Sequence, residues 1–371
     1  MIITFFIGNG FDIRMGIKSS YKEAEKNYIG LVKKSSILKR FQESLSSNGK
    51  YWANFESALG KYTGQFESDK QLDFFACADD FNEELIRYLQ SEEEKIDYQL
   101  CADEIKKEFK RSVSNYNGSV PNRYCNELDG IISQGRQVTF RFVSFNYTHI
   151  LDRCLSTTFD KSTSVGSHVH SSSTYNHYVD NTVLHLHGEL PGPIIMGVDN
   201  KKQISNQPWA EQRRFCQRLA KPDINNRAGS LVDDSVMKLI KDSSIICLYG
   251  MSLGETDKTW WISLGKWLKD PGHRLIIFGH SDRESDVALT HQQQFSLQYE
   301  LTDTFLDLAE IQGAQRDELE NRIFVVINPN LFNINLVELT QKKKQEQKIV
   351  DDLKVKELQL EFEKASKLTT V

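Results

Sequence analysis

The chain has 371 residues, of which 39% are hydrophobic and 26% are charged, and its formal net charge is −5. This composition is typical of a globular protein with one large domain. No apolar run reaches the roughly 20 residues needed to cross a bilayer, and the negative charge argues against broad nonspecific binding of nucleic acid. We therefore expect neither a membrane nor a nucleic acid among the partners of this protein.

The six cysteines are spread over the chain without a CxxC pair, which disfavours a zinc ribbon. Isolated thiols are typical of the reducing cytoplasm, where they are buried as small apolar side chains. The sequence therefore favours a cytoplasmic protein with neither a metal site nor a resident cofactor.

Residues 1–7, MIITFFI, predict a buried strand, because they are apolar, rich in isoleucine and phenylalanine, and followed by a glycine. We interpret them as a structural strand and not as a signal peptide. Residues 20–115 carry charged and apolar residues at helical spacing and contain no proline. We therefore predict that a helical insertion over about 20–135 follows the first strand.

The pattern changes near residue 137, after which apolar strands alternate with helices. We predict strands at 137–145, 182–188, 193–198, 243–250, 273–279 and 322–327, and helices over 207–241, 255–268 and near 286–299. Residues 156–180 are rich in Ser, Thr and His, and we expect a loop or an irregular hairpin there. Strands that alternate with helices indicate an α/β fold with a mostly parallel, buried sheet.

We assign residues 1–335 to this domain and residues 336–371 to a charged C-terminal helix. Val350, Leu353 and Leu360 form part of an apolar stripe along that helix, which a glutamate interrupts. We expect a solvated helix packed on the domain, and a self-association helix in a homo-oligomer is the alternative.

The first strand ends at a Gly-x-Gly turn formed by Gly8, Asn9 and Gly10. The first glycine permits a tight turn, the second lets the backbone approach a phosphate or ribose, and the helix N-terminus beyond presents free N–H groups. The third glycine of the dehydrogenase fingerprint is absent, because Ile13 stands in its place. The turn indicates either a nucleotide site or a structural tight turn, and Asp12 either accepts from a ribose hydroxyl or caps the helix.

Other strands also end in polar residues, and ligands of open α/β sheets bind beyond the carboxyl ends of the strands. Asn146 follows one strand, and its amide can orient a ribose or a water, or cap the helix that starts near Thr148. His187 ends another strand and can act as a general base near neutral pH. His185, two residues earlier, lies on the same face of the strand as His187. We expect His185 to be a hydrogen-bonded core histidine, and a metal site formed by His185 and His187 is the weaker alternative.

A third polar segment follows the strand at 243–250. It contains Gly250 and Ser252, and Asp257 lies near the start of the next helix. Small residues allow a ligand to approach closely, and a serine hydroxyl can bind phosphate. We expect the three tryptophans of that helix to lie in the core and not to stack on a base; they are Trp260, Trp261 and Trp267.

Together these segments resemble the motifs of a known family. IGNGFD, W-x-NFE at residues 52–56, SFNYT, HLHG and G-x-SLGETDK occur in this order and resemble the AbiH family, a group of bacterial abortive-infection, anti-phage proteins. The glycine turn, followed six residues later by Gly16 and Ile17, also resembles the turn of sirtuin-like NAD enzymes. The resemblance covers roughly residues 1–330.

The resemblance implies a sirtuin-like, Rossmann-type sheet that binds NAD or a related nucleotide at this crevice. By their positions, Asn146 would orient water or ribose, and His187 would act as the base. The residues implied to line the nucleotide are Gly8, Asn9, Gly10, Phe11, Asp12, Gly250, Ser252 and Asp257. The paired CxxC zinc module of deacetylating sirtuins is absent, which disfavours protein deacetylation.

These expectations favour a defence effector that hydrolyses NAD+ at the nicotinamide–ribose bond upon infection. The alternative is a nucleotide-binding module without NADase activity that acts through a partner or an oligomer. A nuclease is disfavoured by the net charge and by the lack of a carboxylate-rich metal motif. The sequence does not identify the phage-derived trigger.

Overall fold

The computed structural model describes residues 1–47, 54–135, 137–281 and 289–368 of the chain. In this part of the chain seven strands form one sheet in the order β3-β4-β2-β1-β5-β6-β7. The strands are β1 (Ile2–Ile7), β2 (Val138–Ser144), β3 (Ser164–His170), β4 (Ser173–His185), β5 (Ser243–Tyr249), β6 (Arg274–Gly279) and β7 (Ile323–Ile327). Only the β3–β4 pair is antiparallel among these strands, so the prediction of an α/β fold with a mostly parallel sheet is confirmed.

The strands of the sheet centre are mostly apolar because helices cover both faces. In β1 only Ile2 is partly exposed, and the other residues are buried. From β1 the chain builds the sheet outward in one direction through β2 and β4, and in the other through β5, β6 and β7. The directions diverge between β1 and β5, which makes the carboxyl ends of these two strands the topological switch point of the sheet.

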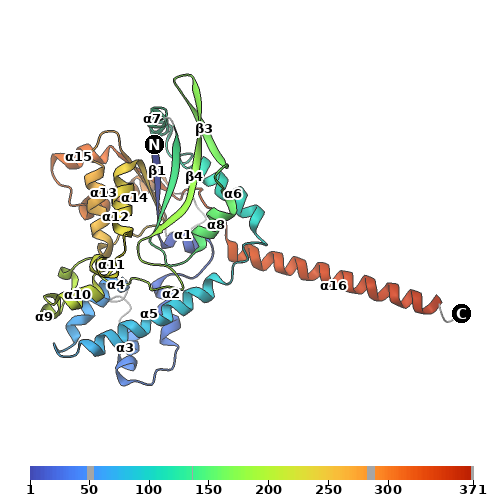
Figure 1. Ribbon diagram of the computed structural model, residues 1–371, viewed down its shortest axis with the longest axis horizontal. Helices are drawn as coiled ribbons and strands as arrows, with labels where there is room; N and C mark the ends of the chain where they lie inside the picture. The colour runs from blue at the N-terminus through green and yellow to red at the C-terminus, as the bar shows by residue number, and fades with distance from the viewer. Residues whose placement is uncertain (48–53, 136, 282–288, 369–371) are drawn as a thin grey trace.

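One face of the sheet packs against α6 (Ala102–Ser114), α7 (Asn122–Ile132) and α8 (Ile150–Thr158). The other face packs against four helices, namely α12 (Val232–Asp242), α13 (Lys258–Trp267), α14 (His291–Leu308) and α15 (Ala314–Glu320). Figure 1 shows these two groups of helices on opposite sides of the strands. The short helix α1 (Asn9–Arg14) follows β1 directly and lies at the carboxyl edge.

A group of helices beyond the carboxyl ends of the strands, which we name the helical lobe, forms a separate apolar core (Figure 1). The lobe contains α2 (Tyr21–Ile29), α3 (Ser36–Ser47), α4 (Phe55–Tyr62), α5 (Gln71–Glu93), α9 (Gln207–Ala210), α10 (Arg213–Leu219) and the neighbouring α11 (Lys221–Ala228). The prediction of helices over residues 20–115 is thus confirmed where the chain is described. The lobe places Glu56 of α4 and Lys221 of α11 at the edge where the strands end.

Three local predictions are wrong or only partly met. Residues 193–198 form no strand; their apolar side chains enter the core of the lobe, because β3 already occupies the outer edge of β4. The strand that contains His185 ends there and not at Gly188. The helix expected near 286–299 begins at His291, and residues 282–288 lie outside the described part of the chain. The hairpin expected within 156–180 is present as β3 and β4.

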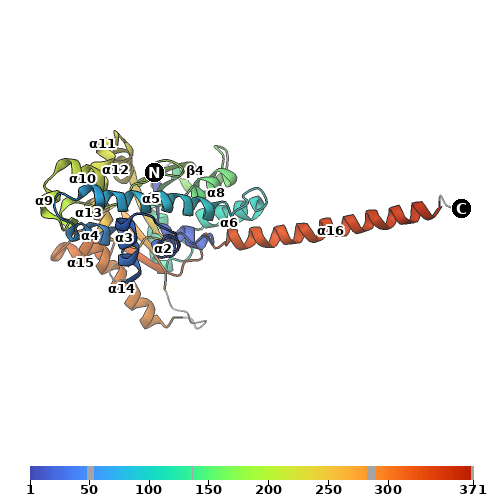
Figure 2. The ribbon, with the colours of Figure 1, turned by 90° about the horizontal axis from the view of Figure 1, so that it is seen from below.

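The C-terminal helix α16 (Leu336–Leu368) extends away from the body of the protein (Figures 1 and 2). Its first turn is packed, with Leu336 and Val337 buried, and Lys343 pairs with Glu104 of α6. Beyond this, apolar residues such as Leu353 are exposed. The expectation of a helix packed on the domain is therefore wrong for most of its length. None of the described helices combines the length and the apolar character that a membrane crossing requires.

Candidate functional site at the carboxyl edge of the sheet

The glycine turn after β1 packs directly against the turn after β5. The backbone N–H of Gly10 donates to Gly250 O at 2.9 Å, and that of Gly8 donates to Tyr249 O at 2.9 Å. A Cβ atom on Gly10 would lie 2.7 Å from the Cα of Gly250, which itself has a φ of +66°. Glycine is therefore required here because two backbones meet at the switch point. The side chain of Asn9 accepts a hydrogen bond from Ser19.

Asp12 is buried beneath this turn, with 2% of its surface exposed. Its Oδ1 accepts from Asn146 Nδ2 at 2.8 Å, and its Oδ2 accepts from the Thr148 hydroxyl at 2.7 Å. Burial raises the pKa of the Asp12 carboxyl to about 7, although these two hydrogen bonds favour the ionised form. Gly8, not Asp12, occupies the N-cap of α1, so the capping alternative is wrong.

Asn146 joins the glycine turn to the end of β2. Besides Asp12, its Nδ2 donates to the carbonyl oxygen of Gly8 at 3.1 Å, and because both partners are acceptors the orientation of the amide is defined. Oδ1 accepts no hydrogen bond from any described residue. The N-cap of α8 is His149, so the capping alternative for Asn146 is wrong as well. We refer to Gly8, Asp12, Asn146 and Thr148 as the Asp12 cluster.

His185 is a hydrogen-bonded core histidine, as expected. Its Nδ1 lies 3.1 Å from the backbone oxygen of Asn146, and its Nε2 lies 3.0 Å from Asp152 Oδ2. Burial lowers the pKa of His185, but the hydrogen bond and charge of Asp152 outweigh burial and leave the pKa raised. The acceptors at its two nitrogens favour the cationic form of His185 and tie its ring to the backbone just after β2.

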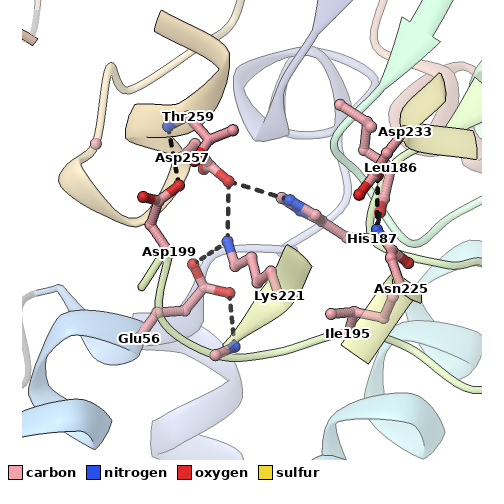
Figure 3. Close-up of polar contacts among 12 residues, drawn as sticks. Glu56, Leu186, His187, Ile195, Asp199, Lys221, Asn225, Asp233, Asp257 and Thr259 are labelled. Carbon is pink, nitrogen blue, oxygen red and sulfur yellow. Dashed lines mark hydrogen bonds and ion pairs between the residues drawn. The ribbon is translucent and has the colours of Figure 1, made fainter. Parts of the chain in front are cut away.

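His187 lies on the other side of this segment, in contact with the rings of Phe145 and Tyr147, whose centroids are 5.3 and 6.5 Å from its own. Its side chain is 7% exposed, and its Nε2 lies 3.1 Å from Asp257 Oδ1 (Figure 3). This distance suits a hydrogen bond, but Nε2 and Asp257 Oδ1 are not aligned well enough to form one. Poor alignment is common in catalytic pairs without substrate.

Asp257 also receives a buried cation. Lys221 Nζ lies 3.0 Å from Asp257 Oδ1 and 2.6 Å from Glu56 Oε2 (Figure 3). Burial would raise the pKa of Asp257, but the charge of Lys221 and the contact with His187 outweigh burial and hold it well below its usual range. Burial would lower the pKa of Lys221, and the two carboxylates raise it instead. We refer to Glu56, His187, Lys221 and Asp257 as the Asp257 cluster.

Sequence reasoning missed Lys221 entirely and assigned no role to Glu56, although Glu56 ends the NFE motif. Their hydrogen bond spans 165 positions, and no local pattern marks Lys221. The only sequence signal was the presence of NFE among motifs that otherwise follow strands. Trp52 of the same motif lies outside the described residues.

The remaining sequence candidates are spread around this edge. The side chain of Phe11 is fully buried and packs against Phe109 and Phe332, so only its backbone faces the turn. Ser252 is exposed at the turn after β5. The predicted core positions of the tryptophans of α13 are confirmed; they are Trp260, Trp261 and Trp267. In the described part of the chain, no contact joins the side chains of Asn146 and His187.

The fold and site define an α/β protein whose polar residues gather where parallel strands diverge. The family model named "Bacteriophage abortive infection AbiH" matches residues 4–279, and the chain therefore belongs to the AbiH family. The matched segment includes every residue of the Asp12 and Asp257 clusters. A search of curated proteins finds no match.

Proposed function

We propose that this AbiH protein is an abortive-infection effector that hydrolyses NAD+ at the nicotinamide–ribose bond, and that the nucleotide binds at the carboxyl edge of the sheet. The observation that carries the proposal is the position of two glycine turns, at Gly8–Gly10 and at Gly250, directly after the strands that flank the switch point. Nucleotides bind at this place in open α/β sheets.

The strand order supports a dinucleotide as the ligand. With β3 left aside, the parallel strands taken in chain order follow the spatial order 3-2-1-4-5-6, which is that of dinucleotide-binding sheets. The sirtuin-like core implied by the motifs has the same kind of sheet. In this proposal the backbone of the two turns, together with Asn9 and Ser252, lies against the nucleotide.

The chemistry requires an oriented ribose, a water and a base. In the proposed reaction the bond between ribose C1′ and the nicotinamide nitrogen breaks, and both electrons leave with neutral nicotinamide. Water forms a bond to C1′, and its proton goes to His187, whose Nε2 faces Asp257 and whose Nδ1 has no partner among the described residues. Asn146 presents its Oδ1 to the ribose or the water, because its NH2 group is held by Gly8 and Asp12.

The test is nicotinamide release from NAD+ by the purified full chain, with His187→Asn and Asn146→Ala beside it. We expect turnover by the wild type and a loss of about a hundredfold or more in His187→Asn, because a general base typically contributes at least that much. His170→Asn on the β3–β4 hairpin is the matched control, since among the described residues its ring meets the Ser133 carbonyl and Tyr175, neither of which belongs to the Asp257 cluster. Wild-type rates in His187→Asn would refute the assignment. Saturable NAD binding without product would instead favour the nucleotide-binding module.

A further inference from the structure

The Asp257 cluster joins four distant segments of the chain through buried charge. Glu56 comes from α4 of the helical lobe, Lys221 begins α11, Asp257 precedes α13, and His187 follows β4. The side chains of Glu56, Lys221 and His187 are 8%, 6% and 7% exposed. Figure 3 shows Lys221 between the two carboxylates, with the imidazole of His187 directed at the same oxygen of Asp257 that Lys221 contacts.

A buried ion pair is a weak source of stability, because the cost of removing its charges from water offsets their attraction. Apolar side chains of similar volume would join the lobe to the sheet at least as well. The presence of charge at this junction therefore points to a task that needs charge. The charge acts most directly on Asp257 and on the imidazole of His187, which Asp257 contacts.

The charges of the cluster do not balance while the imidazole is neutral. Two carboxylates then face one ammonium group, and a proton on His187 brings the sum to zero. The other ionisable groups around the imidazole are Asp233 of α12 and Tyr147, and burial raises the pKa of both. Both are acids, so neither can add a competing cation, and ionisation of either would favour the imidazolium further. The cluster is thus arranged to stabilise the imidazolium that forms when His187 accepts a proton.

The backbone of His187 is also tied to the lobe. Glu56 Oε1 lies 3.3 Å from the Tyr21 hydroxyl, which lies 2.9 Å from the Tyr147 hydroxyl. Tyr147 in turn donates to Ile195 O at 3.3 Å, and Ile195 N donates to His187 O at 2.7 Å. Contacts that begin at Glu56 therefore reach both the side chain and the main chain of the histidine.

We propose that Lys221 is a positioning residue that holds Asp257 as an anion against His187, and that Glu56 of the helical insertion sets the charge around Lys221. The helical lobe is then part of the active site and not only a cover over the sheet. The proposal rests on the proposed hydrolysis for its activity readout, but the protonation of His187 tests it without any substrate.

The test compares Lys221→Met, Lys221→Arg and Glu56→Gln with the wild type in two measurements. The first is the acid limb of the pH profile of kcat/KM for NAD+. The second is the NMR titration of the His187 ring in histidine-labelled full-length protein, with His187→Asn used to identify its signal. Thermal unfolding of each variant shows whether it is folded.

The two charge-removing variants should act in opposite directions. Lys221→Met leaves two carboxylates near the imidazole, so the acid limb and the His187 titration should move up by about one pH unit or more. Glu56→Gln removes a negative charge, so both should move down. Lys221→Arg keeps the charge and should stay close to the wild type. A purely structural role would not reverse the sign of the shift.

The matched control is Lys33→Met, because Lys33 is another buried lysine of the lobe, 2.8 Å from Asp80 and 3.4 Å from Glu84. It should lose stability without moving either curve. An unchanged His187 titration in Glu56→Gln and in folded Lys221→Met would overturn the proposal. If the wild type leaves NAD+ intact, the proposed hydrolysis fails, and the NMR titration alone decides the role of Lys221.

Discussion

Asn146 and Asp12, 134 positions apart in the sequence, are joined by a hydrogen bond of 2.8 Å beneath the glycine turn. Both oxygens of Asp12 accept hydrogen bonds from within the protein, so this buried carboxyl orients the amide of Asn146. The aspartate that follows the glycine turn in the sequence thus fixes the orientation of the neighbouring Asn146 side chain. We therefore expect the buried carboxyl to make the stability of the protein depend on pH near neutrality.

We predict that Asp12→Asn removes a pH dependence from the unfolding of the protein. The carboxyl pKa is about 7 in the folded state, against an ordinary value of 3.8 for an aspartate in water. Folding therefore favours the protonated form, and the stability due to this group is full below pH 4 and is lost as the pH rises through 7. At about 1.4 kcal/mol per pKa unit the limit is about 4 kcal/mol.

Unfolding midpoints measured from pH 5 to 8 check this prediction. Asp12→Asn should be less stable than the wild type at pH 5, because it loses a hydrogen bond, and the difference should shrink or reverse by pH 8. Asp160→Asn is the control, since hydrogen bonds from Thr163 and Ser162 lower the pKa of this exposed carboxyl to about 2 and it stays ionised over the range. A constant difference for Asp12→Asn would contradict the assigned pKa.

Thr148 supplies the second hydrogen bond to Asp12 and should tune the same carboxyl. Thr148→Val removes a donor that favours the ionised form, so the pKa of Asp12 should climb above 7 and the loss of stability should extend to higher pH. The unpaired carboxyl oxygen should cost about 1–3 kcal/mol in the free energy of unfolding. Thr148→Ser keeps the hydroxyl and should restore the wild-type pH profile. Equal profiles for the valine and serine variants would count against this contact.

The contact between the two glycine turns predicts that Gly10→Ala is destabilising. The new methyl group would lie 2.7 Å from the Gly250 backbone, which cannot move without separating β1 from β5. We expect a loss of about 1–3 kcal/mol in the free energy of unfolding. Gly130→Ala makes the same chemical change on the exposed face of α7 with no atom within 4 Å, and should instead stabilise by about 0.5–1 kcal/mol. Similar values for the two variants would refute the close approach.

Because most of α16 is exposed, we predict that most of this helix can be removed without loss of stability. A chain that ends at Gln345 should unfold within about 0.5 kcal/mol of the full chain, as surface changes usually do. Leu336→Ala, in the buried first turn, should cost about 2–5 kcal/mol. Sedimentation of both chains tests the homo-oligomer alternative, because a self-association helix requires that the shortened chain lose an oligomer that the full chain forms.

The sequence by itself determined the elements of the fold and the segments that carry the site. Strands buried on both faces must be apolar throughout, and helices packed on one side must repeat their apolar residues every three to four positions, so both leave local patterns. Polar residues after such strands marked Asn146 and His187, and Asp257 was marked near the start of the helix that follows β5. The same local logic failed at residues 193–198, whose apolar run is equally consistent with a strand or with burial in a second core.

The tertiary structure alone decided what these residues contact. Asp12 contacts Asn146 because segments 134 positions apart meet at one edge of the sheet. Lys221 is buried at the same edge because Glu56, 165 positions away, and Asp257, 36 positions away, meet it there. The burial and the charge pairing of each group arise where these segments pack together, and they set the pKa of that group. Neither burial nor charge pairing can be read from a short segment of the sequence, because the two partners lie in different segments.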